Sequence, residues 1–199
     1  MWIWLLANGL NTASKFIPWK FNDIDHTTAQ DLSDWLQDSS RLSPLILDIR
    51  RLDEFAVSHL PNARHVPPET SDIELRKLLK KIEPPIVVYC SVGYRSGKMA
   101  QRLKKLGCNN VTNLNGSIFS WTTEGHPLQG SNQVHPYNIM GRRMLRDDLE
   151  TKWDTKKWRE KLLKRKGKRV PTGDDTRLIT PYGINACKHI PFKQRLRIN

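Results

Sequence analysis

The chain has 199 residues, a formal net charge of +13 and a hydrophobic fraction of 38%. A chain of this length can bury one sizeable core with extensions at either end. Its three cysteines are too few, and odd in number, for the disulfide framework of a small secreted domain. We therefore expect a reducing, cytoplasmic environment, in which a single thiol can stay reactive.

The positive charge is concentrated toward the C-terminus. Residues 1–139 contain 15 Lys/Arg and 13 Asp/Glu, whereas the last 60 residues contain 18 Lys/Arg and 7 Asp/Glu. The first part is typical of an ordinary soluble domain and the second of a basic appendage. We predict an N-terminal amphipathic segment over 1–26, a domain over 27–130, and a basic, mostly helical or disordered extension over 131–199.

The N-terminus begins with a short apolar run, Met1-Trp2-Ile3-Trp4-Leu5-Leu6. The run is too short to span a membrane and no Lys or Arg precedes it, so we predict neither a transmembrane segment nor a signal peptide. A one-sided stripe at helical spacing is formed instead by Trp2, Leu5, Leu6, Gly9, Ala13, Phe16 and Ile17. This stripe predicts a helix docked on the domain, with a membrane-surface helix or the pairing of two copies as alternatives.

Short apolar strands alternate with helices in the predicted domain. Thr27 and Gln30 have capping-box spacing, which predicts a helix beginning there. Strands are expected at residues 45–47, 63–66, 86–89 and 111–114, and further helices at 54–57, 73–82, 99–106 and 118–121. This alternation predicts an α/β fold with a largely parallel central sheet flanked by helices.

The strongest strand, residues 86–89, runs directly into Cys90-Ser91-Val92-Gly93-Tyr94-Arg95-Ser96. In a parallel sheet, sites form beyond the carboxyl ends of strands, where loops lead into helices. Successive loop N–H groups backed by a helix N-terminus favour an anion, and Arg95 offers a fixed positive charge to a thiolate or an incoming oxyanion. We therefore predict that Cys90 is the nucleophile, although an isolated buried thiol is more often a packing residue.

The magnitudes of these effects are sufficient to make Cys90 a thiolate. The pKa of an unperturbed cysteine is about 8.5, and lowering it by about 2 requires about 2.7 kcal/mol of differential stabilisation. A helix terminus supplies about 0.3–1 kcal/mol, and up to about 2 kcal/mol when partly buried. Hydrogen bonds from the loop must supply the rest.

From Thr27 to Leu128 the sequence resembles the rhodanese family. The resemblance includes Leu47-Asp48-Ile49-Arg50, Asp53-Glu54-Phe55, His59-Leu60-Pro61-Asn62-Ala63, Val88-Tyr89-Cys90 with Gly93 and Arg95-Ser96, Leu114-Asn115-Gly116-Ser117, and Trp121. It implies a six-residue active loop from Cys90 to Arg95, with Ser91 to Ser96 contributing to substrate binding. It also implies that Cys90 attacks a sulfane sulfur, becomes a persulfide and passes the sulfur on, without a metal or organic cofactor.

Loop length narrows the expected chemistry. Phosphatases and arsenate reductases with related loops have five residues between Cys and Arg, whereas this chain has four between Cys90 and Arg95. The shorter loop favours sulfur transfer over these oxyanion reactions. The loop also lacks the Cys-Gly-Ser/Ala-Gly-Val-Thr form associated with mercaptopyruvate, which favours thiosulfate or a persulfide as donor. The acceptor would be cyanide, a thiol or a protein.

Two charged residues, Asp48 and Arg50, stand at the end of a predicted strand, near the loop. They either support the site and orient substrate or, as we favour, hold the adjoining turn together, with Arg50 paired to Glu54. Acidified thiol chemistry needs no general base, so we expect no catalytic role for His59 and His65.

We expect no catalytic role for Cys108 or for Trp121. Cys108 follows a helix end and is expected to pack rather than to react with Cys90, and Cys187 is unassigned. Trp121 is expected to pack beneath the loop or in the core.

Residues 142–169 form the most basic part of the extension and include Trp153 and Trp158. They would bind RNA, an acidic protein or an anionic membrane, or simply solvate the chain. The sequence thus leaves two main functions open: a sulfurtransferase, or a sulfur carrier or regulatory binding module whose tail selects the partner.

Overall fold

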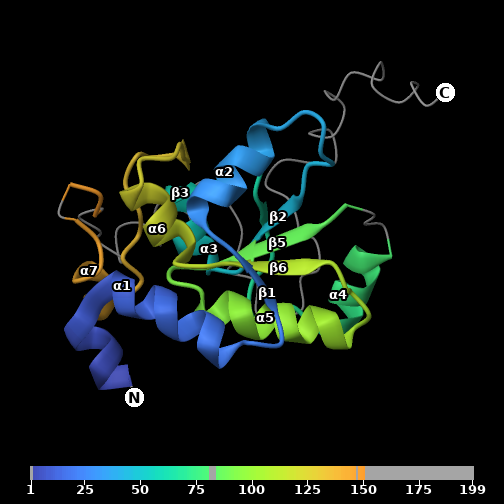
Figure 1. Ribbon diagram of the computed structural model, residues 1–199, viewed down its shortest axis with the longest axis horizontal. Coiled ribbons are helices and arrows are strands. Elements are labelled where there is room, and N and C mark those ends of the chain that lie inside the picture. Colours follow the sequence, from blue (N-terminus) through green and yellow to red (C-terminus); the bar gives the residue numbers. More distant parts are fainter. Residues whose placement is uncertain (1, 81–83, 147, 151–199) are drawn as a thin grey trace, which may run out of the picture.

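The computed structural model describes residues 2–80, 84–146 and 148–150, without the side chains of 2–8, 139 and 140. Its centre is a five-stranded sheet in the order β1-β6-β5-β2-β4, and every strand pair in it is parallel (Figure 1). The strands are β1 Asp25–Thr27, β2 Leu45–Asp48, β4 Arg64–His65, β5 Ile86–Tyr89 and β6 Val111–Leu114. The predicted α/β fold with a parallel central sheet is confirmed.

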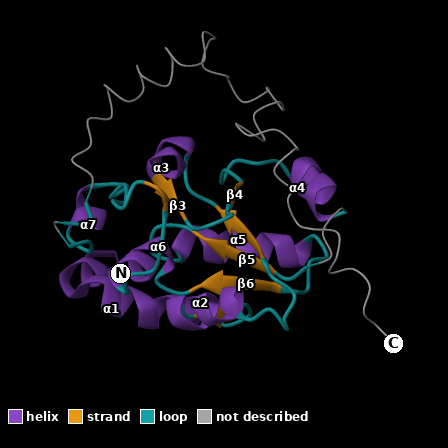
Figure 2. Cartoon of the chain, turned by 90° about the horizontal axis from the view of Figure 1, so that it is seen from above, coloured by secondary structure: helices purple, strands orange, loops and turns teal. Residues whose placement is uncertain are grey.

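Helices cover both faces of the sheet. In Figure 1, α2 (Ala29–Gln37) lies above the sheet and α5 (Tyr94–Lys105) lies below it. The helix α6 (Ser117–Thr123) shares a core cluster with α2, and α4 (Asp72–Leu79) shares the other with α5. Figure 2 shows the strands, in orange, enclosed by these helices. Alternate side chains of β5 enter two separate core clusters, Val87 and Tyr89 above and Ile86 and Val88 below. Burial on both faces explains why this strand is an uninterrupted apolar run.

The first helix of the domain begins one residue later than predicted. Thr27 belongs to β1, where it is paired with Leu114. The capping box is therefore made by Thr28, whose hydroxyl accepts a hydrogen bond from the Asp31 amide at 3.1 Å. The Asp31 carboxylate accepts one in return from the Thr28 amide at 3.4 Å. The prediction of Thr27 and Gln30 as this box was wrong because strand pairing uses Thr27.

Several short elements were not predicted from the sequence. They are β1, the helix α3 (Leu52–Val57, of which only its last turn was expected), the antiparallel pair β3 (Ser58–His59) and β7 (Gln129–Gly130), and the four-residue helix α7 (Ile139–Arg142). Two- and three-residue strands are too short to show a period in the sequence. They depend on tertiary pairing.

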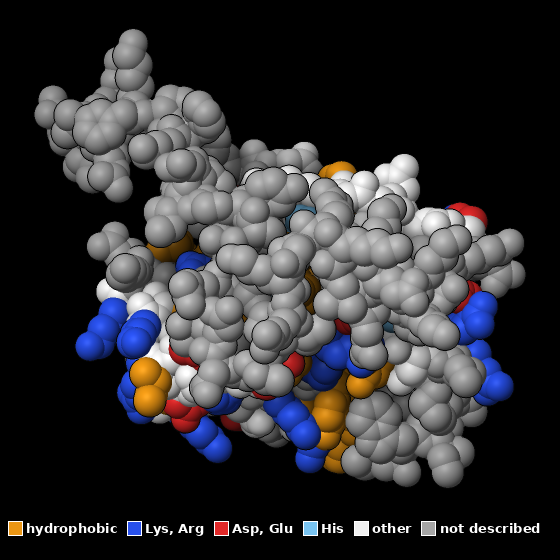
Figure 3. Space-filling view, turned by 180° about the vertical axis from the view of Figure 1, so that it is seen from behind, with side chains coloured by type: hydrophobic (Ala, Val, Ile, Leu, Met, Phe, Trp, Pro, Cys, Tyr) orange, Lys and Arg blue, Asp and Glu red, His pale blue; other side chains and the backbone are white. Residues whose placement is uncertain are grey.

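The packed core extends past residue 130, where the sequence predicts a domain boundary. Val134 and Leu145 are buried in the same cluster as Leu60, Phe119 and Trp121, so residues 131–150 pack on the domain. The predictions for Trp153, Trp158, Cys187 and the basic block lie outside the described residues. Among the residues described, no helix is long and apolar enough to cross a membrane. On the face shown in Figure 3, the described Lys and Arg side chains are scattered among acidic ones.

The N-terminal helix α1 (Trp2–Lys20), broken by the non-helical backbone of Gly9, docks on the domain beside α5 (Figure 1). Ala13, Ile17 and Phe21 are buried. Gly97 of α5 makes the close approach possible, because a Cβ at that position would lie 2.6 Å from the Phe21 ring. The predicted docking is thus observed for the described side chains.

Substituting Gly97→Ala tests this contact. Alanine favours a helix by about 1 kcal/mol over glycine, but overpacking against Phe21 costs about 1–3 kcal/mol. We expect a net loss of unfolding free energy in urea titrations, and a smaller loss or a gain when Gly97→Ala is made in a Phe21→Leu background. An equal cost in both backgrounds would show that residue 97 does not pack against the Phe21 ring.

Candidate active site

The loop that begins at Cys90 connects β5 to α5 at the carboxyl edge of the sheet. Gly93 is the N-cap of α5 with φ 106°, a left-handed conformation that favours glycine. The loop is fixed by residues of β6 and α6: the Cys90 amide donates to Ser117 Oγ at 3.1 Å, and Asn113 Nδ2 donates to the Gly93 carbonyl at 3.1 Å. The first residues of the loop therefore have a fixed backbone path.

The amides at the start of α6 complete this support. The Ile118 amide donates to the Cys90 carbonyl at 3.3 Å, and the Phe119 amide donates to the Ser91 carbonyl at 3.2 Å. These bonds hold the loop carbonyls from outside the loop. The Gly93 amide donates to Cys90 Sγ at 3.2 Å.

The Cys90 thiol lies inside this loop and is only 1% exposed. Burial raises its pKa and is the largest single influence, but the charge of Arg95, polar groups of Ser96 and the Gly93 amide together lower the pKa below the ordinary value. The lowered pKa favours the thiolate, which is the nucleophilic form of cysteine.

Arg95 is held by two partners in the site. Its Nη1 and Nη2 donate to the two Glu54 carboxylate oxygens at 2.9 and 2.8 Å, and Nη2 also donates to Ser91 Oγ at 2.8 Å. Glu54, on α3, is buried, and the Ser91 hydroxyl donates to it at 3.1 Å. The guanidinium is therefore one member of a fixed ion pair with Glu54.

Arg95 and Glu54 each favour the ionised form of the other. Burial raises the pKa of Glu54, but the hydrogen bonds and charge of Arg95 outweigh it and the net pKa is lowered. Burial likewise works against the charge of Arg95, and Glu54 and the Cys90 thiolate outweigh it and raise the Arg95 pKa. Both groups stay ionised, so Arg95 provides a permanent charge near Cys90.

Asp48 and Arg50 form a separate, fully buried pair on the neighbouring strand. Arg50 Nη2 donates to Asp48 Oδ2 at 2.7 Å and to the Ser58 carbonyl at 2.6 Å, and the Tyr89 hydroxyl donates to Asp48 Oδ2 at 2.5 Å. The expected pair of Arg50 with Glu54 is replaced by this arrangement. These contacts join the ends of β2 and β5 to β3, which supports the structural interpretation of both residues.

The two histidines considered as general bases lie beside α3 and have structural contacts. His59 Nδ1 is 3.1 Å from the Phe55 carbonyl, and its ring stacks on Phe55 with a centroid separation of 4.0 Å. His65 Nε2 is 2.7 Å from the Arg50 carbonyl. Burial lowers the pKa of both rings, which favours their neutral forms.

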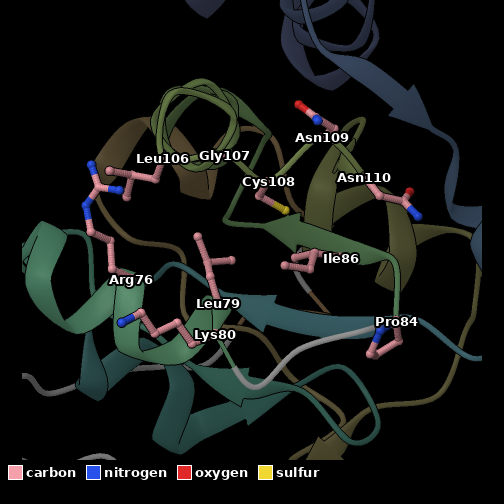
Figure 4. A pocket seen from close by; sticks show the side chains of 10 residues that line it. All are labelled: Arg76, Leu79, Lys80, Pro84, Ile86, Leu106, Gly107, Cys108, Asn109 and Asn110. Atoms are coloured by element: carbon pink, nitrogen blue, oxygen red, sulfur yellow. The ribbon is translucent and has the colours of Figure 1, made fainter.

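Cys108 lies at the opposite edge of the sheet from Cys90. It follows the C-terminal end of α5, whereas Cys90 precedes the N-terminal end of this 12-residue helix, which is about 18 Å long. It lines a pocket of about 480 Å³ together with Arg76, Leu79, Lys80, Pro84, Ile86, Leu106, Gly107, Asn109 and Asn110 (Figure 4). Burial raises the pKa of its thiol, so packing rather than reaction with Cys90 is the role that the structure supports.

Four contributors to the site were given either no role or a different partner from the sequence: Glu54 was expected to pair with Arg50, and Ser117, Asn113 and Tyr137 were given no role. Glu54 and Ser117 stand within the quoted motifs, so their positions, though not their partners, were visible. Asn113 and Tyr137 carry no local signal, because they reach the loop only through the tertiary fold. The Tyr137 ring lies 4.2 Å from the Arg95 guanidinium carbon.

The fold and the loop define a parallel α/β domain with a buried cysteine directly after its central strand. The profile described as Rhodanese-like domain matches residues 28–124. A sulfurtransferase of Allochromatium vinosum is 32% identical over 107 residues, which cover 54% of this chain and 94% of that protein. The chain belongs to the rhodanese-like family.

Two further similarities agree with this family. The uncharacterized protein YqhL of Bacillus subtilis is 36% identical over 76 residues, which cover 38% of this chain and 59% of that protein. The crystal structure of a thiosulfate sulfurtransferase from Pseudomonas aeruginosa superposes with a TM-score of 0.51 at 24% identity, covering 64% of this chain and 24% of that one. The second similarity shows the fold alone. The family relationship supports sulfur transfer as the general class of chemistry.

The buried Asp48–Arg50 pair can be tested by stability. Substituting Arg50→Met leaves Asp48 as a buried charge without its main partner, so we expect a loss of about 3–5 kcal/mol of unfolding free energy in urea titrations. The matched control is Arg102→Met, which removes the exposed pair with Asp72 and should cost about 1 kcal/mol or less. Equal losses in the two variants would contradict a structural role for the buried pair.

Proposed function

We propose that this protein is a sulfurtransferase that moves sulfane sulfur from thiosulfate or a persulfide donor to a thiophilic acceptor through a persulfide on Cys90. The single observation that carries this proposal is the Cys90 thiol, buried within a loop whose Gly93 amide points at the sulfur. The lowered pKa of the thiol supports the same role, because the thiolate is the attacking form.

In the first half of the proposed reaction, the Cys90 thiolate attacks the outer sulfur of thiosulfate. The S–S bond of thiosulfate breaks, sulfite leaves with the electron pair, and Cys90 becomes a persulfide. In the second half, an acceptor such as cyanide attacks the outer sulfur of the persulfide. The persulfide S–S bond breaks and the thiolate is restored, so no external oxidant or reductant is consumed.

The position of Arg95 bears on how the donor is held. Its Nη1 and Nη2 already donate to Glu54 and Ser91, so we expect loop amides and the N-terminus of α5 to share in holding the charge of a bound donor. A low-molecular-weight persulfide carries less charge at the reacting end than thiosulfate. Both donors should therefore be compared at equal concentration.

The test is persulfide formation followed by mass spectrometry. After incubation with thiosulfate, we expect the intact protein to gain one sulfur atom, located on the Cys90 peptide, and to lose it to cyanide as thiocyanate. Cys90→Ser should abolish both steps, whereas Cys108→Ser should retain them. Turnover that persists in Cys90→Ser, or sulfur found on Cys108 instead, would overturn the proposal.

Burial of the thiol favours a second candidate, a sulfur carrier or regulatory module that reacts only with a docked partner. In that case the Cys90 persulfide would form but would transfer slowly to cyanide, and a protein acceptor selected by the basic C-terminal part would accelerate transfer. Truncation after Glu150 is the suitable probe, because residues 131–150 pack on the domain. Loss of partner-dependent transfer with unchanged cyanide turnover would favour the carrier.

A further inference from the structure

The segment that follows the rhodanese-like region is attached firmly beside the active loop. Residues after 124 lie outside the family match. The Ser58 hydroxyl donates to the Gln133 carbonyl at 2.7 Å, Val134 is buried in the core, and its amide donates to the Leu149 carbonyl at 2.8 Å. The turn that comes next, residues 135–138, therefore has a fixed starting point.

This turn brings Tyr137 onto the guanidinium of Arg95. The ring centroid is 4.2 Å from Arg95 Cζ and 5.8 Å from Arg51 Cζ. The N–H groups of Arg95 are used along its edge by Glu54 and Ser91, so the ring occupies a face of the guanidinium that those bonds leave open. Stacking of an aromatic ring on arginine combines cation–π attraction with exclusion of water.

The backbone at Tyr137 shows that the placement of this ring is constrained. Its φ is 66°, a left-handed conformation that is uncommon for a residue other than glycine. Its amide donates to Nδ1 of the buried His135 at 2.9 Å, which holds the turn. The side chain is 41% exposed, so burial in the core does not account for this conformation.

We propose that Tyr137 is a positioning residue of the site, which holds the Arg95 guanidinium against the Cys90 loop from outside the rhodanese-like region. This inference rests on the proposed role of Cys90 as the nucleophile. Its mechanism is electrostatic: the ring keeps water from one face of Arg95, and a less hydrated cation attracts the Cys90 thiolate more strongly. Without the ring, the thiolate is less favoured.

The charged and titratable groups that face Arg95 come from three elements. Glu54 comes from α3, Tyr137 from the C-terminal turn and Cys90 from the loop itself. Around Glu54 lie Arg50, Arg51 and Asp53, and His135 interacts with these groups. Glu54 has a lowered pKa and stays ionised through the neutral range. Burial lowers the pKa of His135, which favours its neutral form.

The experiment is the pH dependence of Cys90 alkylation by iodoacetamide in the full chain, resolved by peptide mass spectrometry. Tyr137→Asn removes the ring while tolerating the left-handed backbone, and Tyr137→Phe keeps the ring. We expect Tyr137→Asn to raise the apparent pKa of Cys90 and to slow its alkylation below that pKa by about threefold. Tyr137→Phe should match the wild type, and the profile of Cys108 should be unchanged in both variants.

Two results would overturn this inference: a Cys90 profile in Tyr137→Asn that equals the wild type, or a loss in Tyr137→Phe as large as in Tyr137→Asn. Thermal unfolding identifies a variant that does not fold. Tyr137→Gly, which removes the ring and also accepts the left-handed backbone, then gives the same comparison. The readout uses no sulfur donor, so failure of the proposed sulfur transfer would be seen separately, as the absence of a Cys90 persulfide in the wild type.

Discussion

The bidentate ion pair between Arg95 and Glu54 is the interaction on which the rest of the site depends. It joins α3 to the first turn of α5 across the mouth of the loop, and Ser91 bonds to both partners. Removing either partner would leave the other as a buried or half-buried charge, which is costly. The pair also fixes a positive charge near a thiol that burial alone would keep protonated.

The parallel sheet explains why these groups meet. Because β2 and β5 are parallel and in register from Leu45–Ile86 to Asp48–Tyr89, their carboxyl ends reach the same edge. Asp48, Tyr89 and Arg50 tie that edge together, and the residues just beyond it, Cys90 and the start of α3, are brought face to face. The buried polar network therefore fixes the edge of the sheet from which the Cys90 loop begins.

Elements whose cause lies in neighbouring residues could be predicted from the sequence, whereas contacts made only by the tertiary fold could not. The strand Ile86–Tyr89, the position of Cys90 after it and the helix that follows have local causes in apolar runs, a glycine and a helix start, and the sequence contains all three signals. The partner of Glu54 has no local cause in the sequence, because Arg50 and Arg95 are both suitable cations and only the tertiary fold decides between them. Tyr137 lies 42 positions beyond Arg95 in the printed sequence and has no periodic or motif signal, so its contact with Arg95 required the structure.

The central claim is that Arg95, held by Glu54, lowers the pKa of Cys90 and so favours its thiolate form. Its most direct test is the ultraviolet absorbance of the thiolate followed across pH, with Cys90→Ser subtracted to isolate this residue. We predict a midpoint below the ordinary value of about 8.5 in the wild type and a higher midpoint in Arg95→Met. A wild-type midpoint at or above about 8.5, or a midpoint that does not move in Arg95→Met, would contradict the account.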